Sequence, residues 1–168
     1  MIDFKTIDNF KPWLIQSILK NSYAKFIDCF PNDKDKFYKQ WEQEDSDAFN
    51  NPLTIGKYLF FACLKDIPIG YCSWDDRENP IGIIGQNCIL TEYQRQGYDR
   101  KQIELIIKIF KDNKFNEIRV ITGEHEFFKP AQRIYEKCGF KERQRIDGDL
   151  FKRIELYKLL KDLNNWTD

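Results

Sequence analysis

"ILTEYQRQGYDRKQ", residues 89–102, changes character twice within one short stretch. An apolar, strand-like run ends at Leu90, a polar loop with a single glycine follows, and a charged segment with helical apolar spacing then begins. The first amides of a helix lack intrahelical partners, and the helix dipole places partial positive charge there. A strand that turns through Gly97 into a helix therefore predicts an anion site. Arg95, Arg100 and Lys101 would add positive charge around it.

This loop by itself is weak evidence for function. It matches neither the phosphate-binding G-x-x-x-x-G-K-[ST] loop nor the dinucleotide-binding G-x-G-x-x-G pattern. A single glycine before a helix often marks only a turn. A second motif, "PAQRIYEKCGF" at residues 130–140, strengthens the case because it places Tyr135 about 38 residues after Gly97. It reads as a short helix ended by Gly139, since glycine tolerates the left-handed conformation that follows many helices.

Together the two motifs resemble the GCN5-related N-acetyltransferase superfamily, in its bacterial branch. There a (Q/R)-x-x-G-x-(G/A) loop holds the pyrophosphate of acetyl-coenzyme A, and a tyrosine-bearing helix ends in a Gly-Phe step into the next strand. "QRQGYD" and "AQRIYEKCGF" take these places. The resemblance covers Ile69 to Arg145 well, and the amino-terminal helices only by their order. It implies acetyl-coenzyme A as acyl donor, with no metal.

Carried over by position, the resemblance implies a set of cofactor-binding residues. Gln94 to Arg100 would hold the pyrophosphate, and the strand from Asn87 to Leu90 would pair through its main chain with the pantetheine arm. Tyr135 would lie beside the sulfur. The full set is Asn87, Cys88, Ile89, Leu90, Gln94, Arg95, Gln96, Gly97, Tyr98, Asp99, Arg100, Phe128, Ala131 and Tyr135.

Two residues depart from the family pattern. Asp99 stands at the usual second Gly/Ala position, and Phe128 stands where many members carry asparagine. A carboxylate near a diphosphate is repulsive, by about 1–3 kcal/mol at about 5 Å and intermediate dielectric. We expect Asp99 to turn away and cap the helix at Lys101 or Gln102. The alternatives are weaker cofactor binding or none.

The implied reaction is attack of an amine on a thioester. An alkylammonium must first lose a proton, through a base or in a dry pocket. A strand amide near Ile89 or Leu90 is the predicted oxyanion donor, and the Tyr135 hydroxyl the predicted proton donor to the leaving thiolate. The candidate bases are Glu124, His125, Glu92 and Asp75. Cys88 has no histidine adjoining it in sequence, which disfavours an acyl-cysteine route.

The acceptor is the least defined part of the site. In this superfamily the first helices and the hairpin loops line the acceptor side. "FYKQWEQEDSDAF" combines aromatic rings with carboxylates, which suits a cationic amine, although a solvated acidic helix face has the same composition. Gln86 interrupts an apolar strand, either to contact substrate or to occupy a bulge. The predicted acceptor-binding residues are Tyr38, Trp41, Trp74 and Gln86.

The order of predicted elements favours an α+β or three-layer α/β fold. Helices are expected within 8–21, 32–49, 99–114 and 128–140, and strands within 57–66, 67–76, 80–90, 116–124, 140–146 and 150–160. We predict a mixed, mostly antiparallel sheet of about six to seven strands with a splayed central pair, flanked by about four helices. One domain spans 1–168: a helical acceptor-side segment (1–50), a cofactor-binding core (57–147), and a C-terminal strand and tail (148–168).

Composition limits the function further. The 168 residues are 42% apolar and 32% charged, which is typical of a globular protein, and the formal net charge of zero argues against a general nucleic-acid or membrane-surface role. No run of 18 apolar residues and no signal peptide is evident. Five cysteines without C-x-x-C pairs favour reduced thiols in the cytoplasm. A monomer or homodimer is expected.

Three functions follow in order. The first is N-acetylation of a primary amine on a small molecule or peptide, by direct attack on acetyl-coenzyme A. The second is a non-catalytic module of the same fold that binds coenzyme A or acyl-coenzyme A. The third is acetyl transfer to a protein or to aminoacyl-tRNA, against which the charge balance argues.

Overall fold

The computed structural model describes residues 1–160, which divide into two units. The first unit consists of Met1–Ser73 and Gln86–Gln102, and the second of Trp74–Gly85 and the described residues from Ile103 onward. Seven strands form one open, mostly antiparallel sheet in the order β1-β2-β3-β4-β5-β7-β6. The predicted α+β fold is confirmed, with five α-helices among the described residues in place of about four. The single domain over 1–168 stays a prediction.

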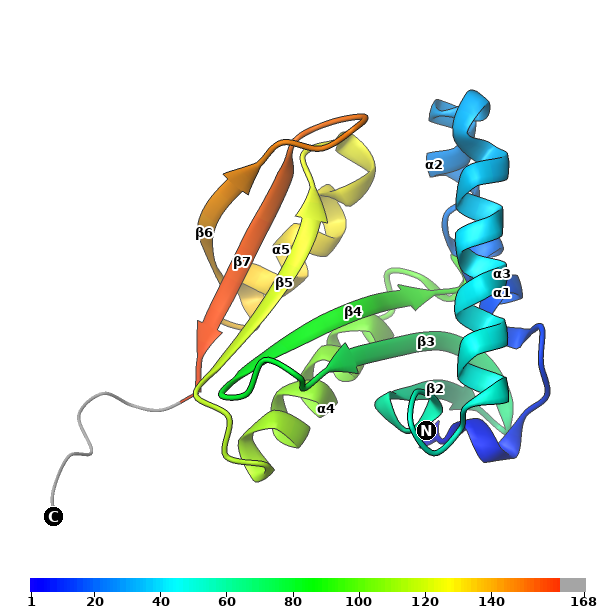
Figure 1. Cartoon of the computed structure of the whole chain (residues 1–168), viewed down its shortest axis with the longest axis horizontal. Helices are drawn as coiled ribbons and strands as arrows, with labels where there is room; N and C mark the ends of the chain where they lie inside the picture. Colours follow the sequence, from blue (N-terminus) through cyan, green and yellow to red (C-terminus); the bar gives the residue numbers. More distant parts are fainter. Residues whose placement is uncertain (161–168) are drawn as a thin grey trace, which may run out of the picture. The chain divides into compact units, whose positions relative to one another are not determined.

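Three helices of the first unit precede its central strands. They are α1 (Leu14–Ser22), α2 (Ala24–Cys29) and α3 (Lys34–Asn50), and α1 and α3 lie side by side (Figure 1). The separate α2 helix was not predicted. The predicted start near Asp8 or Asn9 is wrong, because a 3-10 turn (Ile7–Asn9) and Pro12 come before the helix.

The start of α1 depends on a residue distant in sequence. Asp45 of α3 is 2% exposed, and its carboxylate accepts the main-chain amides of Trp13 at 2.8 Å and of Ile15 at 2.9 Å. It also lies 3.3 Å from the Gln16 amide. Trp13 takes a left-handed conformation with φ of 83° at this point. A carboxylate that accepts these unpaired amides stabilises a helix start that its local sequence does not specify.

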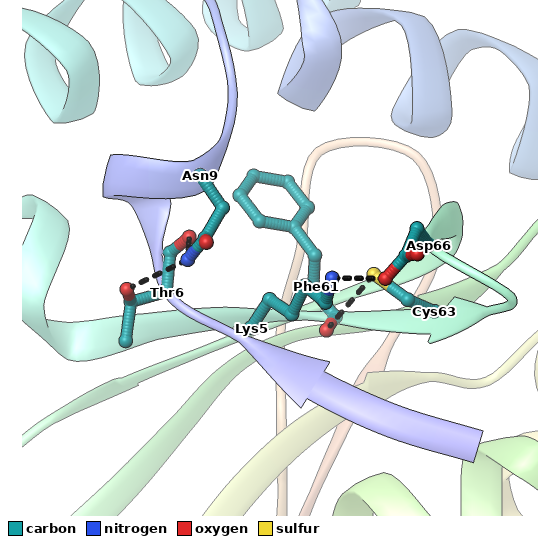
Figure 2. Close-up of polar contacts among 6 residues, drawn as sticks. All are labelled: Lys5, Thr6, Asn9, Phe61, Cys63 and Asp66. Carbon is teal, nitrogen blue, oxygen red and sulfur yellow. Dashed lines mark hydrogen bonds and ion pairs between the residues drawn. The ribbon is translucent and has the colours of Figure 1, made fainter.

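A hairpin forms the sheet of the first unit, as predicted. Strand β2 (Leu59–Leu64) pairs antiparallel with β3 (Ile67–Asp75), and the two-residue turn Lys65–Asp66 has φ of 47° and 68°. Positive φ at both central residues is the type I′ geometry that matches strand twist. Figure 2 shows Asp66 in an ion pair with Lys5 of β1 (Ile2–Lys5), the edge strand beside β2. This strand was not predicted, because the first 50 residues were expected to be helical.

The second unit is built on β5 (Glu117–Gly123), β7 (Arg153–Leu159) and β6 (Lys141–Ile146), which stand side by side in that order (Figure 1). Helix α5 (Lys129–Lys137) ends as predicted. Gly139 has φ of 90°, and the amides of Gly139 and Phe140 return to the carbonyls of Glu136 (2.9 Å) and Tyr135 (3.0 Å). This double bond pattern is the Schellman motif.

Two elements run through both units. Strand β4 (Ile81–Ile89) pairs in parallel with β5 from Ile81–Glu117 to Ile84–Val120, and helix α4 spans Tyr98–Asp112. A Cβ on Gly82 would lie 2.3 Å from the Phe110 ring of α4, so only glycine allows the strand and helix to approach this closely. The predicted splay of the central strands stays a prediction.

Each unit has its own apolar core. In the first unit the most buried side chains come from α1, β2 and β3: Ile15, Ile18, Leu19, Phe61, Ile69 and Tyr71. In the second they come from α4 and β5: Ile103, Ile106, Phe110, Ile118 and Val120. None of the helices within residues 1–160 has the length and apolar character needed to cross a membrane. Of the predicted C-terminal segment 148–168, residues 161–168 lie outside the described part of the chain.

Candidate active site

The two polar residues in the apolar run of β4 face opposite sides of the sheet. Successive side chains of a strand alternate in direction. Gln86 accordingly contacts Tyr23 and Glu44, from the helical segment before β2, whereas Asn87 contacts Gln102 of α4. The predicted alternative of a bulge is therefore not needed to explain Gln86.

Gln86 belongs to a polar network with Glu44 at its centre. The Tyr71 hydroxyl donates to Glu44 Oε1 at 2.8 Å, and Gln86 Nε2 donates to Glu44 Oε2 at 3.3 Å. The Tyr23 hydroxyl donates to Gln86 Oε1 at 3.3 Å, and the Gln86 amide donates to Ser73 Oγ at 2.9 Å. These bonds hold a half-buried carboxylate of α3 against β3 and β4.

Burial sets the electrostatics of this network. Loss of solvation raises the pKa of Glu44, and the hydrogen bonds from Tyr71 and Gln86 only partly oppose this shift. The pKa values of Tyr23 and Tyr71 are also raised by burial, and the pKa of the Cys88 thiol is raised to about 12. The two phenols and the thiol are therefore neutral at physiological pH, and Glu44 is the proton acceptor among them. A Cys88 thiolate nucleophile is disfavoured.

On the opposite face of β4, Gln102 anchors the first turns of α4. Its side chain is fully buried, and its Nε2 donates to Asn87 Oδ1 at 2.6 Å and to the Cys88 carbonyl at 3.3 Å. A Cβ on Gly70 would lie 2.6 Å from Gln102 Oε1, so glycine at this position of β3 makes room for the amide. The Asn87 side chain is thus engaged within the chain.

The end of β4 is also engaged within the first unit. The Leu90 amide donates to the Ile69 carbonyl at 2.8 Å, and the Ile89 carbonyl accepts Gln94 Nε2 at 2.9 Å. The predicted use of the Leu90 amide as oxyanion donor is therefore corrected: sheet pairing already occupies this N–H. Gln94, predicted to contact phosphate, uses its side chain to tie the loop back to the strand.

The loop itself has the backbone expected of an anion site. Arg95 and Gly97 both have positive φ, 61° and 83°, and residues 94–97 are exposed. Nothing lies within 4 Å of a Cβ built on Gly97, so the space beside it is open. The Lys101 amide donates to the Gly97 carbonyl at 3.3 Å, which leaves the amides of Tyr98 to Arg100 ahead of the intrahelical ladder. The residues present fit a diphosphate.

Asp99 modifies this helix start. Its Oδ1 accepts the Arg100 amide at 2.8 Å. The carboxylate does take a helix amide, but the predicted partners Lys101 and Gln102 are wrong, because Asp99 already lies in the first turn of α4, which begins at Tyr98. One amide otherwise available to an anion is therefore used by the chain.

The predicted aromatic acceptor site is largely occupied by the protein's own side chains. The Lys20 ammonium lies 4.6 Å from the Tyr38 ring centroid and 3.0 Å from Glu42 Oε1. Trp41 is 5% exposed and stacks on Tyr23 at 5.5 Å between centroids. Trp74 is half-buried on β3, in the second unit. Contact of these three rings with substrate stays a prediction.

The predicted residues of α5 and its preceding turn lie in the second unit. Tyr135 is 4% exposed, and its ring meets Phe140 edge-on at 5.3 Å between centroids. The Phe128 ring packs against Gly123, where a Cβ would lie 2.5 Å from it. Ala131 is half-buried on α5. Their cofactor contacts stay predictions.

Three of the predicted bases are committed elsewhere. Glu124 forms an ion pair with Arg145 at 2.8 Å. His125 Nδ1 accepts the Phe127 amide at 3.1 Å, so the neutral ring carries its proton on Nε2 and offers no second acceptor. Hydrogen bonds from Arg77 lower the pKa of Asp75, which weakens it as a base. Glu92 is exposed in a 3-10 turn (Thr91–Tyr93).

Glu44 was missed as a candidate base, although its spacing contains a signal. Trp41, Glu44, Asp45 and Ala48 stand at positions i, i+3, i+4 and i+7, which share one face of a helix. Trp41, Asp45 and Ala48 are buried, so the two carboxylates lie on the packed face of α3. Within residues 1–160, no group of His, Cys, Asp and Glu side chains could hold a metal ion.

Comparison with known proteins supports this reading of the fold. The acetyltransferase (GNAT) family matches residues 23–140, more than half of the chain. A protein from Desulfovibrio desulfuricans assigned to this family has a similar structure (TM-score 0.73, 13% identity, covering 96% of this chain and 100% of that one). So has a PaiA N-acetyltransferase from Thermoplasma acidophilum, solved with coenzyme A (0.64, 15%, 95% and 99%). A Bacillus subtilis acetyltransferase solved with coenzyme A matches a shorter part (0.53, 18%, 59% and 74%). No curated protein sequence matches.

Proposed function

The chain belongs to the acetyltransferase (GNAT) family, and from this premise we propose that it transfers an acetyl group from acetyl-coenzyme A to a primary amine. The acceptor is an amine of a small molecule or peptide, which attacks the thioester directly. The observation that carries the proposal is the loop after β4, where positive φ at Arg95 and Gly97 and the open space beside Gly97 accompany the start of α4.

Binding of the donor is assigned to the loop and the helix start. Main-chain amides near Gly97 and Tyr98, with the Arg95 and Arg100 side chains, would hold the diphosphate, because unpaired amides and the helix dipole both favour anions. Acetyl-coenzyme A, when bound, supplies the thioester carbonyl that the amine attacks. Engagement of Ile89 and Leu90 within the chain limits main-chain pairing with the pantetheine arm to the remaining groups of the strand.

Proton transfer completes the reaction. We assign protonation of the departing thiolate to the Tyr135 hydroxyl, which the family pattern places at the sulfur and which donates a proton readily near its ordinary pKa of about 10. Packing against Phe140 supports the assignment, because a ring fixed by its neighbours presents its hydroxyl in one orientation.

A thiol-release assay tests the proposed function. Purified protein is incubated with acetyl-coenzyme A and, separately, with simple amines, polyamines, aminoglycosides and peptides, and free coenzyme A is followed. We expect release that depends on one class of amine, with mass spectrometry showing a product heavier by one acetyl group. Release from none of these acceptors, or equal release without amine, would contradict the proposal.

A second candidate function is a module that binds coenzyme A or acyl-coenzyme A without turnover. The observation that favours it is Asp99, whose carboxylate takes the Arg100 amide and adds negative charge at the anion site. Calorimetric binding of acetyl-coenzyme A together with no thiol release across the whole panel would select this function. Turnover of any amine would eliminate it.

A further inference from the structure

Glu44 is a half-buried carboxylate that lacks a countercharge. The Tyr71 hydroxyl and the Gln86 amide donate to its two oxygens at 2.8 and 3.3 Å, and both donors are neutral. Among residues 1–160 it forms no ion pair. Charges removed from water are ordinarily paired, so the surroundings of Glu44 are incomplete without a cation.

Nearby carboxylates differ from Glu44 in this respect. Glu42, on the same helix, is paired with Lys20 at 3.0 Å. Asp45, the next residue in the chain, accepts main-chain amides at the start of α1. A carboxylate has about four lone-pair sites, and Glu44 uses one on each oxygen. It therefore keeps acceptor capacity for an incoming N–H donor.

We infer that Glu44 receives the ammonium group of the acceptor and takes its first proton. This inference rests on the proposed function and names the acceptor as a cationic primary amine. The ammonium gives one proton to Glu44, the neutral nitrogen attacks the thioester carbon, an N–C bond forms and the C–S bond breaks. The second nitrogen proton ends on the departing thiolate, and Glu44 later releases its proton to solvent, so atoms and charge balance. Gln86 and Tyr71 act as positioning residues.

The groups that face Glu44 support ionisation of this one residue at neutral pH. They are Tyr23 before α2, Tyr71 on β3, Cys88 on β4 and Asp45 on its own helix. The first three are neutral at that pH because burial raises their pKa values. Desolvation and Asp45 raise the pKa of Glu44, which makes it a stronger proton acceptor than an exposed glutamate.

The test compares Glu44→Gln with Glu42→Gln, which removes a paired carboxylate from the same helix. Using the amine that the thiol-release panel identifies, we expect Glu44→Gln to lower kcat/KM at pH 7 by about 100-fold or more, the contribution of a general base. The rate of this variant should keep rising with pH toward the pKa of the amine, about 10.4. Glu42→Gln should change kcat/KM by less than about 3-fold, as for a surface ion pair. Glu44→Asp, which keeps a carboxylate, should recover part of the rate.

The pH profile separates catalysis from packing. In the wild type, kcat/KM should fall as pH decreases through the pKa of Glu44, because only the ionised form accepts a proton. Tyr71→Phe removes a hydrogen bond that lowers this pKa, so its acid limb should move to higher pH while the rate at high pH is largely kept. A Glu44→Gln enzyme with an unchanged rate and acid limb would overturn the inference while the proposed function stands. An inactive wild type would overturn both.

Discussion

Gly97 faces two separate requirements, one from the backbone and one from the ligand. Its φ of 83° is a left-handed conformation that costs residues with a Cβ about 1–2 kcal/mol, yet an added Cβ would meet nothing within 4 Å. Strain and ligand contact can therefore be varied independently at this position.

We predict that Gly97→Ala weakens coenzyme A binding modestly and that Gly97→Glu weakens it about 10- to 100-fold further. A carboxylate about 5 Å from a phosphate charge costs about 1–3 kcal/mol at intermediate dielectric. Isothermal titration calorimetry at fixed ionic strength measures both variants, and Gly97→Ala controls for backbone strain. Equal affinities for the two variants would remove the loop from the proposed site.

Tyr135 differs from Gly97 because its ring and its hydroxyl have separable roles. Phenylalanine keeps the edge-on contact with Phe140 and removes only the hydroxyl. We predict that Tyr135→Phe lowers kcat about 10- to 1000-fold with little change in acetyl-coenzyme A affinity. Tyr157→Phe, on β7 of the same unit, is the matched control. A Tyr135→Phe enzyme as fast as the parent would leave this residue a packing role alone.

Among the elements, α1 is the helix whose start depends most on another part of the chain. Its first amides are accepted by Asp45, which is 2% exposed on α3. Removal of this carboxylate leaves several helix amides buried without an acceptor.

We predict that Asp45→Ala lowers the free energy of unfolding by about 2–4 kcal/mol. Asp47→Ala, two residues further along the same helix, should cost less than about 1 kcal/mol, because Asp47 accepts only the Gln43 side chain, at 2.7 Å. Urea denaturation followed by circular dichroism gives both values. Similar losses for the two variants would argue against the cap as the cause.

For the chain as a whole, the five cysteines report how burial is distributed. Cys63, Cys72 and Cys88 are buried, Cys138 is half-buried and Cys29 is exposed. Burial also raises the pKa of Cys72 and raises that of Cys88 to about 12, so both remain thiols, which react poorly.

We predict that a thiol-specific chromogenic reagent at pH 8 labels Cys29 and Cys138 in the folded protein, and the other three only after unfolding in urea. Mass spectrometry of digested samples assigns each site. Rapid labelling of Cys88 under native conditions would contradict its place in the core. The same labelling of Cys29 sets the background to subtract when coenzyme A release is followed with this reagent.

Features made by residues close in sequence were predictable. The hairpin turn at Lys65–Asp66, the end of α5 at Gly139 and the glycine turn before α4 each depend on neighbours a few positions apart. Local geometry and hydrogen bonding suffice for such features, and for this reason two short motifs were enough to indicate the acetyltransferase family.

What the sequence determined by itself was therefore the fold class, the family and the loop for the donor. Tertiary structure alone decided where α1 begins, because Asp45 lies about 30 residues from the amides it accepts. It also decided that Glu44, and not Glu124 or His125, is the carboxylate without a countercharge. Its partners Tyr71 and Gln86 follow it by 27 and 42 positions. Burial and pairing depend on residues that only folding brings together, and these two properties determine which carboxylate can accept a proton.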